Sequence, residues 1–144
     1  MEIKVKKRNG RLEDFNAAKV NKCAERACEG LDGTSASELI LEANVKLFDK
    51  IRTSEIDAAL IEAAKQMFSK DPNYSYVASR LLVSCIYKEV LKESVDCDTF
   101  AQDYQGSFIK NIKAMVKAGY ADPSLLKMDL KRLAAAIDPD RDFK

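Results

Sequence analysis

Basic side chains cluster around one predicted turn near the N-terminus, and cations at this density are suited to binding an anion such as phosphate. The turn is Asn9-Gly10, a dipeptide that readily adopts positive φ at both centres of a tight hairpin. It is flanked by five cations, Lys4, Lys6, Lys7, Arg8 and Arg11, and Lys19 follows them. Segments 2–8 and 11–15 are therefore predicted to form a β-hairpin rich in positive charge.

Lys7 is predicted to point toward the inner face of this hairpin. Side chains alternate between the faces of a strand, so Lys7 shares a face with Val5 and not with Lys6. Burying an unpaired cation is costly, so Lys7 requires an anionic partner, which could be Glu13, Asp14 or a phosphate ligand. A solvated hairpin that only aids solubility is the simpler interpretation of the charge pattern. A nucleic-acid patch is a weaker one, because aromatic residues for base stacking are missing between the cations.

Two further features could contact an anion. Thr53 and Ser54 stand at a predicted helix start, where hydroxyls and unpaired backbone N–H groups can hold a phosphate. Lys88, late in another predicted helix, is a further cation, although its spacing alone favours a surface lysine. The sequence lacks the glycine-rich phosphate loops G-x-x-x-x-G-K-[ST] and G-x-G-x-x-G. A nucleotide site here would depend on side-chain cations and a helix N-terminus.

Catalysis and metal binding that depend on His are excluded by the composition. The sequence contains no His, which removes the usual general base and the commonest zinc ligand. Its four cysteines, Cys23, Cys28, Cys85 and Cys97, form no C-x-x-C pair. Reduced and mostly buried thiols are favoured over a zinc site or a disulfide framework.

The composition indicates one compact domain. The 144 residues are 47% hydrophobic and 33% charged, with 5 Gly, 3 Pro and a net charge of +1. This is too apolar for a disordered chain and too charged for a membrane span. The basic N-terminus has no apolar signal core, so we expect a reduced, cytoplasmic protein that contacts neither membrane nor nucleic acid.

Six helices are predicted to follow the hairpin and to position its cations. In each helix, apolar residues recur at three- and four-residue intervals. The last apolar residues of the six helices are, in order, about Leu31, Phe48, Phe68, Leu91, Met115 and Ala134. The expected N-caps are Asn16, Ser35, Thr53 or Ser54, Asp71 before Pro72 at the first helical position, Asp96 or Asp98, and Asp122 before Pro123. The fourth helix is apolar on more than one face, so we expect it to be central and largely buried. The polar run 138–144 has no closing element, which is typical of a chain cut before its end.

Four ordered blocks carry a family resemblance. They are residues 5–20, 51–56, 71–82 and 87–88, and together they span about 2–93. These blocks resemble the ATP-cone, the nucleotide-binding regulatory domain of ribonucleotide reductases. A repressor family that carries a zinc ribbon before its cone is less similar, because the cone pattern here begins at residue 2. Segments 108–120, 125–126 and 137–144 look like the connection from the cone to the catalytic barrel of the class I large subunit.

The resemblance implies a mainly α fold. Residues 1–93 would form a four-helix ATP-cone bundle capped by the β-hairpin, which is the regulatory nucleotide-binding domain. Residues 94–144 would form a helical linker leading toward a catalytic barrel that this sequence does not contain. The parent protein would be a ribonucleoside-diphosphate reductase, and this piece would catalyse nothing.

The resemblance also implies a ligand and its contacts. ATP, as activator, or dATP, as inhibitor, would bind beneath the hairpin as an allosteric effector, with Mg²⁺ as an accompanying ion and no catalytic cofactor. The phosphates would contact Lys7, Arg8 and Lys88, with a hydroxyl from Thr53. The base and ribose would contact Glu13, Asn16 and Lys19, with apolar and backbone contacts from Val5.

One residue departs from the family pattern. Many relatives have His where this chain has Asp57, and a carboxylate there would repel phosphate but could accept a hydrogen bond from the base amine or the ribose. The implied partners are the rest of the large subunit and, through oligomerisation, the small radical-generating subunit. The alternative is a non-enzymatic helical interaction module whose basic hairpin binds RNA or an acidic partner.

Overall fold

The computed structural model describes residues 3–44, 48–91 and 100–143 and divides the chain into two compact units. The first unit is Met1–Ser94 and the second is Val95–Lys144. Each is described by itself. The described parts are mainly α-helical, as expected, with one small sheet in the first unit. In these parts of the chain, no helix has the length and apolar character needed to cross a membrane.

The sheet begins with the predicted hairpin. Strands β1 (Lys4–Lys6) and β2 (Leu12–Asp14) pair antiparallel with Lys4 opposite Asp14. Gly10 adopts a φ of +84° in the turn, as predicted, but Asn9 does not have a positive φ, so the predicted positive φ at both centres of the turn is wrong for Asn9. The strands are shorter than predicted. A third strand, β3 (Ile51–Arg52), pairs parallel to β1 and was not predicted, because two residues are too few for a period-two pattern.

Helix α1 (Ala17–Cys28) and helix α2 (Ala36–Ala43) begin at their predicted caps. The Asn16 side chain accepts a 2.9 Å hydrogen bond from the N–H of Ala18, and the Ser35 hydroxyl accepts one from Glu38. Helix α2 ends at Ala43, where Asn44 turns left-handed with a φ of 41°, so the predicted continuation to Phe48 is wrong. Residues 45–47, including Leu47 of the predicted stripe, lie outside the described residues.

Helix α3 (Thr53–Gln66) follows β3 directly and passes into the 3₁₀ turn η1 (Met67–Ser69). The prediction that Thr53 or Ser54 caps α3 is wrong. The cap is Arg52, whose backbone N–H donates to the Glu55 carboxylate at 2.9 Å, because sheet pairing keeps the chain extended as far as Arg52. Thr53 and Ser54 are already inside the first turn.

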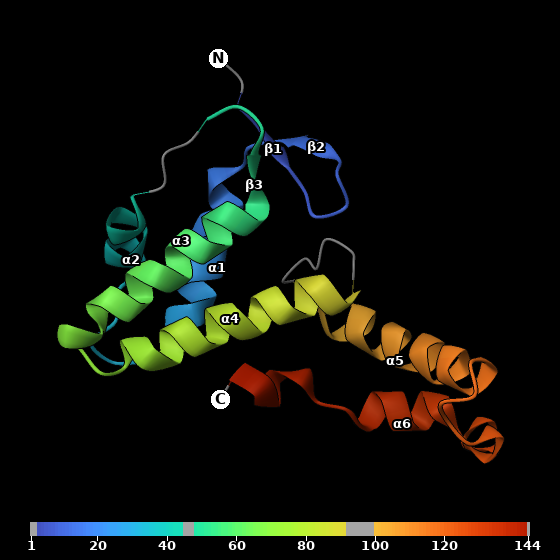
Figure 1. The fold of residues 1–144 in the computed structure, drawn as a ribbon. Helices are drawn as coiled ribbons and strands as arrows, with labels where there is room; N and C mark the ends of the chain where they lie inside the picture. The colour runs from blue at the N-terminus through green and yellow to red at the C-terminus, as the bar shows by residue number, and fades with distance from the viewer. Residues whose placement is uncertain (1–2, 45–47, 92–99, 144) are drawn as a thin grey trace. The chain divides into compact units, whose positions relative to one another are not determined.

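Helix α4 (Tyr74–Leu91) lies beside α3, and the two meet at η1 (Figure 1). The Asp71 carboxylate accepts a 2.8 Å hydrogen bond from the N–H of Asn73, but the helix begins at Tyr74, so Pro72 is not its first residue. A turn made by Pro72 and Asn73 separates Asp71 from the helix.

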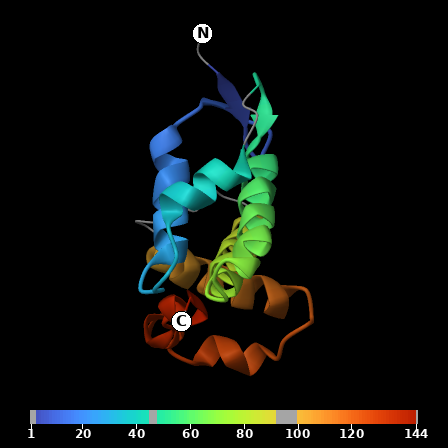
Figure 2. The same cartoon turned by 90° about the vertical axis from the view of Figure 1, so that its left-hand side faces the viewer.

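The core of the first unit lies between α1, α2, α3 and α4, with α2 crossing between α1 and α3 (Figure 2). Its largest fully buried side chains are Tyr74, Leu39, Leu60 and Val77. The Tyr74 hydroxyl accepts a 3.0 Å hydrogen bond from the N–H of Ser35 and so joins α4 to the start of α2. A smaller cluster of Val5, Ile51 and Ile56 attaches the sheet to α3.

The expected burial of α4 on more than one face is wrong. One row is buried at Tyr74, Val77 and Leu81, while Leu82, Ile86 and Val90 on another row are 51%, 50% and 61% exposed. Helices α1 and α3 cover one side of α4. The apolar row that follows Leu82 therefore faces away from the described core.

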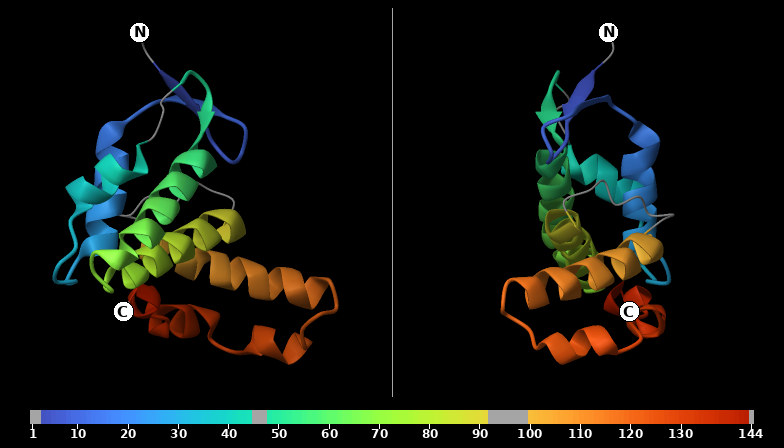
Figure 3. Two further views of the ribbon diagram at one scale, coloured as in Figure 1. Left: turned by 60° about the vertical axis from the view of Figure 1, so that its left-hand side comes forward. Right: turned by 90° about the vertical axis from the view of Figure 1, so that its right-hand side faces the viewer.

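The second unit contains helix α5 (Phe100–Lys117), with helix α6 (Leu130–Ala136) and two 3₁₀ turns, η2 (Pro123–Lys127) and η3 (Pro139–Phe143), packed along it (Figure 3). The predicted caps Asp96 and Asp98 of α5 lie outside the described residues. Gly119 has a φ of +79° just beyond α5, as predicted for its stop. The predicted helix after Asp122-Pro123 is divided. Asp122 caps η2, and Asp129 caps α6, where it accepts from the N–H of Arg132.

Candidate functional site

The first group of charged residues at the hairpin joins the turn, β2 and α1, and we call it the Glu13 triad. The Glu13 carboxylate lies 2.9 Å from the Lys7 ammonium and 2.5 Å from that of Lys19. Lys7 comes from the start of the turn, Glu13 from β2 and Lys19 from α1. The sequence required an anionic partner for Lys7, and Glu13 is the one observed.

The second group, the Asp57 triad, joins the turn to α3 and α4. The two oxygens of the Asp57 carboxylate lie 3.0 Å from Arg8 Nη1 and 2.9 Å from Lys88 Nζ. Arg8 Nη2 also lies 3.9 Å from a Glu89 carboxylate oxygen. The side chain of Asp57 is 12% exposed, whereas that of Glu13 is 40% exposed. The Asp57 triad is therefore the better shielded of the two.

The pKa values follow from these pairs. Hydrogen bonds from Lys19 and then Lys7 lower the pKa of Glu13 from 4.5 to about 2. Burial, the largest single effect, would lower the pKa of Lys88, but its interactions with Asp57, together with those with Cys23 and Cys85, outweigh burial and raise the pKa. Burial is also the largest single effect on Arg8 and would lower its pKa, but the hydrogen bond and charge attraction with Asp57, together with smaller interactions with Cys85, outweigh burial and raise the pKa. All three groups are thus charged at neutral pH.

The charge balance of the two triads is positive. Four cations share two carboxylates, and the exposed Glu89 near Arg8 adds a third negative charge, which leaves one positive charge between the hairpin and the helices beneath it. Cations that are partly shielded from water attract a phosphate more strongly than fully solvated ones. A multiply charged anion could therefore replace or join the carboxylates here.

The other expected contact residues lie around the triads. Val5 is buried in the sheet beside Ile51, so its backbone and apolar surface belong to the floor of the hairpin. Thr53 is the half-buried first residue of α3, one helical turn before Asp57. The Asn16 side-chain oxygen caps α1, which leaves the amide nitrogen of that side chain as its remaining polar group.

Sequence reasoning missed two neighbours of Arg8. Glu89 is one, and the half-buried Cys85 thiol, whose pKa is raised by burial, is the other. Cys85 precedes Lys88 by three residues on α4, a spacing that places both on one helix face. This spacing from Lys88 is the sequence feature that could have indicated Cys85 as a neighbour of the site. Cys23, Cys28 and Cys85 form no disulfide and are largely, though not fully, buried, so the expectation of reduced and mostly buried thiols is confirmed for them, and Cys97 lies outside the described residues.

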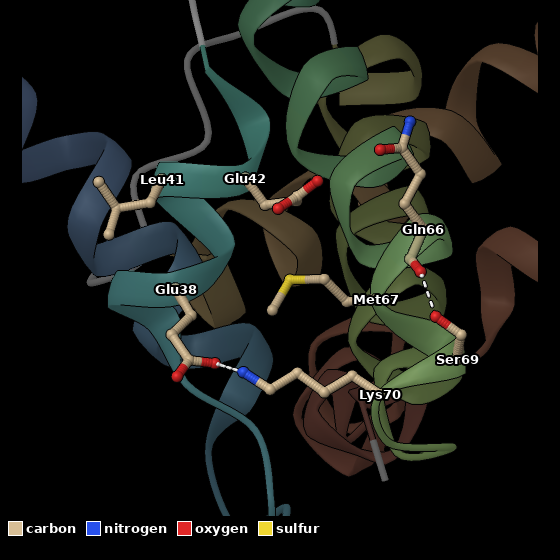
Figure 4. A pocket seen from close by; sticks show the side chains of 7 residues that line it. All are labelled: Glu38, Leu41, Glu42, Gln66, Met67, Ser69 and Lys70. Carbon is tan, nitrogen blue, oxygen red and sulfur yellow. Dashed lines mark hydrogen bonds and ion pairs between the residues drawn. The ribbon is translucent and has the colours of Figure 1, made fainter.

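An open pocket of about 490 Å³ lies at the other end of α3 (Figure 4). It lies between α2 and η1 and is lined by Glu38, Leu41, Glu42, Gln66, Met67, Ser69 and Lys70. Its one cation, Lys70, forms an ion pair with Glu38, and Glu42 adds a second negative charge. This lining does not suit a phosphate. Among residues 3–44, 48–91 and 100–143, no group of three metal-binding side chains occurs.

The arrangement defines a class of domain: a helical bundle covered at one end by a short sheet, with cations of the hairpin and helices converging there. The chain belongs to the ATP cone domain family, whose profile matches residues 3–89. This confirms the family expected from the four sequence blocks.

Curated relatives extend the similarity past the cone. The chain is 35% identical over 151 aligned residues to the ribonucleoside-diphosphate reductase subunit alpha of Helicobacter pylori (strain ATCC 700392 / 26695), with 99% of this chain and 17% of the relative covered. It is 31% identical over 144 residues to ribonucleoside-diphosphate reductase 1 subunit alpha of Escherichia coli (strain K12), with 96% and 18% covered. The chain thus spans less than a fifth of the length of these relatives.

Proposed function

We propose that residues 1–93 bind an adenine nucleotide, ATP or dATP, as an allosteric effector. The observation that carries the proposal is the pair of triads, in which Lys7, Arg8, Lys19 and Lys88 lie around two carboxylates and hold an excess of positive charge. Membership of the ATP cone family supports a nucleotide as the anion.

The contacts divide by chemistry. Lys7, Arg8 and Lys88 bind the phosphate chain, and the Thr53 hydroxyl at the start of α3 adds a hydrogen bond there. Arg8 suits this role because a guanidinium can donate two parallel hydrogen bonds to one phosphate. The base and ribose lie toward Glu13, Asn16 and Lys19, above the apolar floor at Val5. Any Mg²⁺ arrives with the phosphates.

The regulated activity is that of a ribonucleoside-diphosphate reductase, the name carried by the relatives. ATP would favour the active arrangement of that enzyme and dATP an inactive one. This requires that each nucleotide binds one arrangement better than the other, because equal affinity for two states shifts neither. The arrangements would involve the rest of the large subunit and the small radical-generating subunit.

Calorimetry and thermal shift with ATP, dATP, GTP and a short RNA test the proposal on the 144-residue chain. ATP and dATP should raise the melting temperature at millimolar concentration, and GTP should do so much less. Lys65→Ala, which removes an exposed lysine paired with Glu62 on α3, should bind ATP like the unmodified chain. If RNA raises the melting temperature while ATP and dATP leave it unchanged, an interaction module with a basic hairpin replaces the nucleotide proposal.

A further inference from the structure

The Asp57 carboxylate lies between two of the cations to which a phosphate group is expected to bind. Its carboxylate forms hydrogen bonds with both Arg8 and Lys88, two of the three cations assigned to the phosphate chain. These cations come from elements that are distant in sequence, the hairpin turn and α4. A carboxylate and a phosphate offer the same kind of acceptor to a guanidinium and an ammonium.

We propose that Asp57 is an internal competitor for the phosphate chain. When no ligand is bound, its carboxylate holds Arg8 and Lys88 in place as a phosphate oxygen would. When a phosphate chain binds, Asp57 gives up at least one of the two cations. The inference rests on phosphate binding at the proposed site and adds a residue that sets which anions can bind there.

The position of Asp57 distinguishes it from Glu13. Glu13 is on the hairpin, is 40% exposed and pairs with Lys7 of the same hairpin, so the two move together. Asp57 is on α3, is 12% exposed and connects Arg8 of the hairpin to Lys88 of α4. Displacing Asp57 therefore breaks the ion pairs that join the turn to α3 and α4, whereas displacing Glu13 breaks its ion pair with Lys19 of α1 and leaves the turn joined to α3 and α4.

The competition implies a preference for highly charged ligands. A ligand must replace one negative charge that is already well placed, so its gain depends on bringing more charge than Asp57 provides. A triphosphate or tripolyphosphate brings several charges to the same cations. A single carboxylate or a chloride ion brings one and gains little. Asp57 therefore disfavours the binding of anions that carry a single charge.

Calorimetry with inorganic tripolyphosphate is the deciding experiment, because this probe has neither base nor ribose. The titration uses the 144-residue chain, Asp57→Asn and the matched control Glu89→Gln, which removes one negative charge near Arg8 but no shared hydrogen bond. Asp57→Asn should tighten tripolyphosphate binding about fivefold or more, in line with the loss of one charged hydrogen bond that the ligand had to replace. Glu89→Gln should change it less than about twofold, since the charge is exposed.

A measurement on the unmodified chain keeps the test valid if Asp57→Asn does not fold. The side-chain carboxyl carbon of Asp57, followed by NMR, should shift on addition of tripolyphosphate, while that of the exposed Glu62 should not. A fixed Asp57 resonance under saturating tripolyphosphate overturns the proposal. So does unchanged or weaker tripolyphosphate binding by folded Asp57→Asn.

The same titrations with ATP separate this inference from the proposed function. If the unmodified chain binds ATP but Asp57→Asn does not tighten tripolyphosphate binding, the proposal that Asp57 competes with phosphate is overturned and the nucleotide proposal remains. If Asp57→Asn tightens tripolyphosphate binding but ATP does not bind to the unmodified chain, the proposal that Asp57 competes with phosphate is supported and the nucleotide proposal fails. If tripolyphosphate binds neither chain, the competitor is overturned, because freeing the two cations has not made an anion site.

Discussion

Lys7 is the residue whose role can be separated most cleanly from the others. It pairs with Glu13 and is assigned to phosphate. Lys7→Ala should weaken ATP binding about tenfold or more, because a charged hydrogen bond contributes about 1.5 to 3 kcal/mol, and should leave adenosine binding nearly unchanged. Calorimetry with both ligands measures the difference. Equal losses for ATP and adenosine would contradict the phosphate role.

The contribution of Glu13 to the stability of the fold depends on pH. Its pKa in the folded chain is about 2, below the ordinary value of 4.5, so it stabilises the fold fully above about pH 4.5 and loses this contribution as the pH falls toward 2. Glu13 is 40% exposed, so solvent screening limits the contribution to about 1 kcal/mol or less. Urea unfolding should show Glu13→Gln less stable than the unmodified chain at pH 6 and nearly equal to it at pH 2. A difference of the same size at both pH values would be evidence against this pairing.

At the scale of elements, Gly33 fixes the connection between α1 and α2. Its φ is +73°, and a Cβ built there would lie 2.2 Å from an Asp71 carboxylate oxygen. Gly33→Ala should therefore cost roughly 1 to 3 kcal/mol, from left-handed backbone strain and from moving the carboxylate that accepts the N–H of Asn73. Thermal unfolding measures the loss. Gly30→Ala is the control, because it has a similar φ of +68° but open space at the Cβ, so it should cost less.

Local patterns predicted most of the elements. Asn9-Gly10 located the hairpin, and Asn16 and Ser35 located the starts of α1 and α2, because turns and caps depend on neighbours within three residues. The start of α3 was misplaced because pairing with β1, far away in sequence, keeps Arg52 extended. The burial of α4 was also wrong. An apolar pattern shows which residues could be buried but not which neighbours cover them.

The candidate site was predicted residue by residue but not as a network. The direction of Lys7 followed from strand alternation, and its pairing with Glu13 was among the options considered. The Asp57 triad joins residues separated by 49 and 31 positions, and no local pattern contains that information. The assignment of Asp57 near base or ribose remains a prediction, while its ion pairs with the phosphate-binding cations came from the structure.

At the scale of the whole molecule, we expect this chain to hold nucleotide without hydrolysing it. The sequence has no His and no glycine-rich Walker loop, and the two carboxylates of the proposed site, Glu13 and Asp57, are assigned to the base and ribose and not to a water molecule at the γ-phosphate. Long incubation with ATP and Mg²⁺, followed by chromatography, should return ATP unchanged. ADP release that persists after repurification and disappears in Lys88→Ala would contradict a purely regulatory role.

The direct passage from β3 into α3 has a mechanical consequence. No loop separates Arg52 from Thr53, and β3 is hydrogen-bonded to β1, so a displacement of the hairpin turns the first residues of α3 with it. A helix of 14 residues is about 21 Å long and behaves as a stiff rod. A tilt of roughly 5° at one end moves the other end by about 2 Å. The α3 helix can thus serve as a lever arm, converting a small movement over the triads into a larger one at η1.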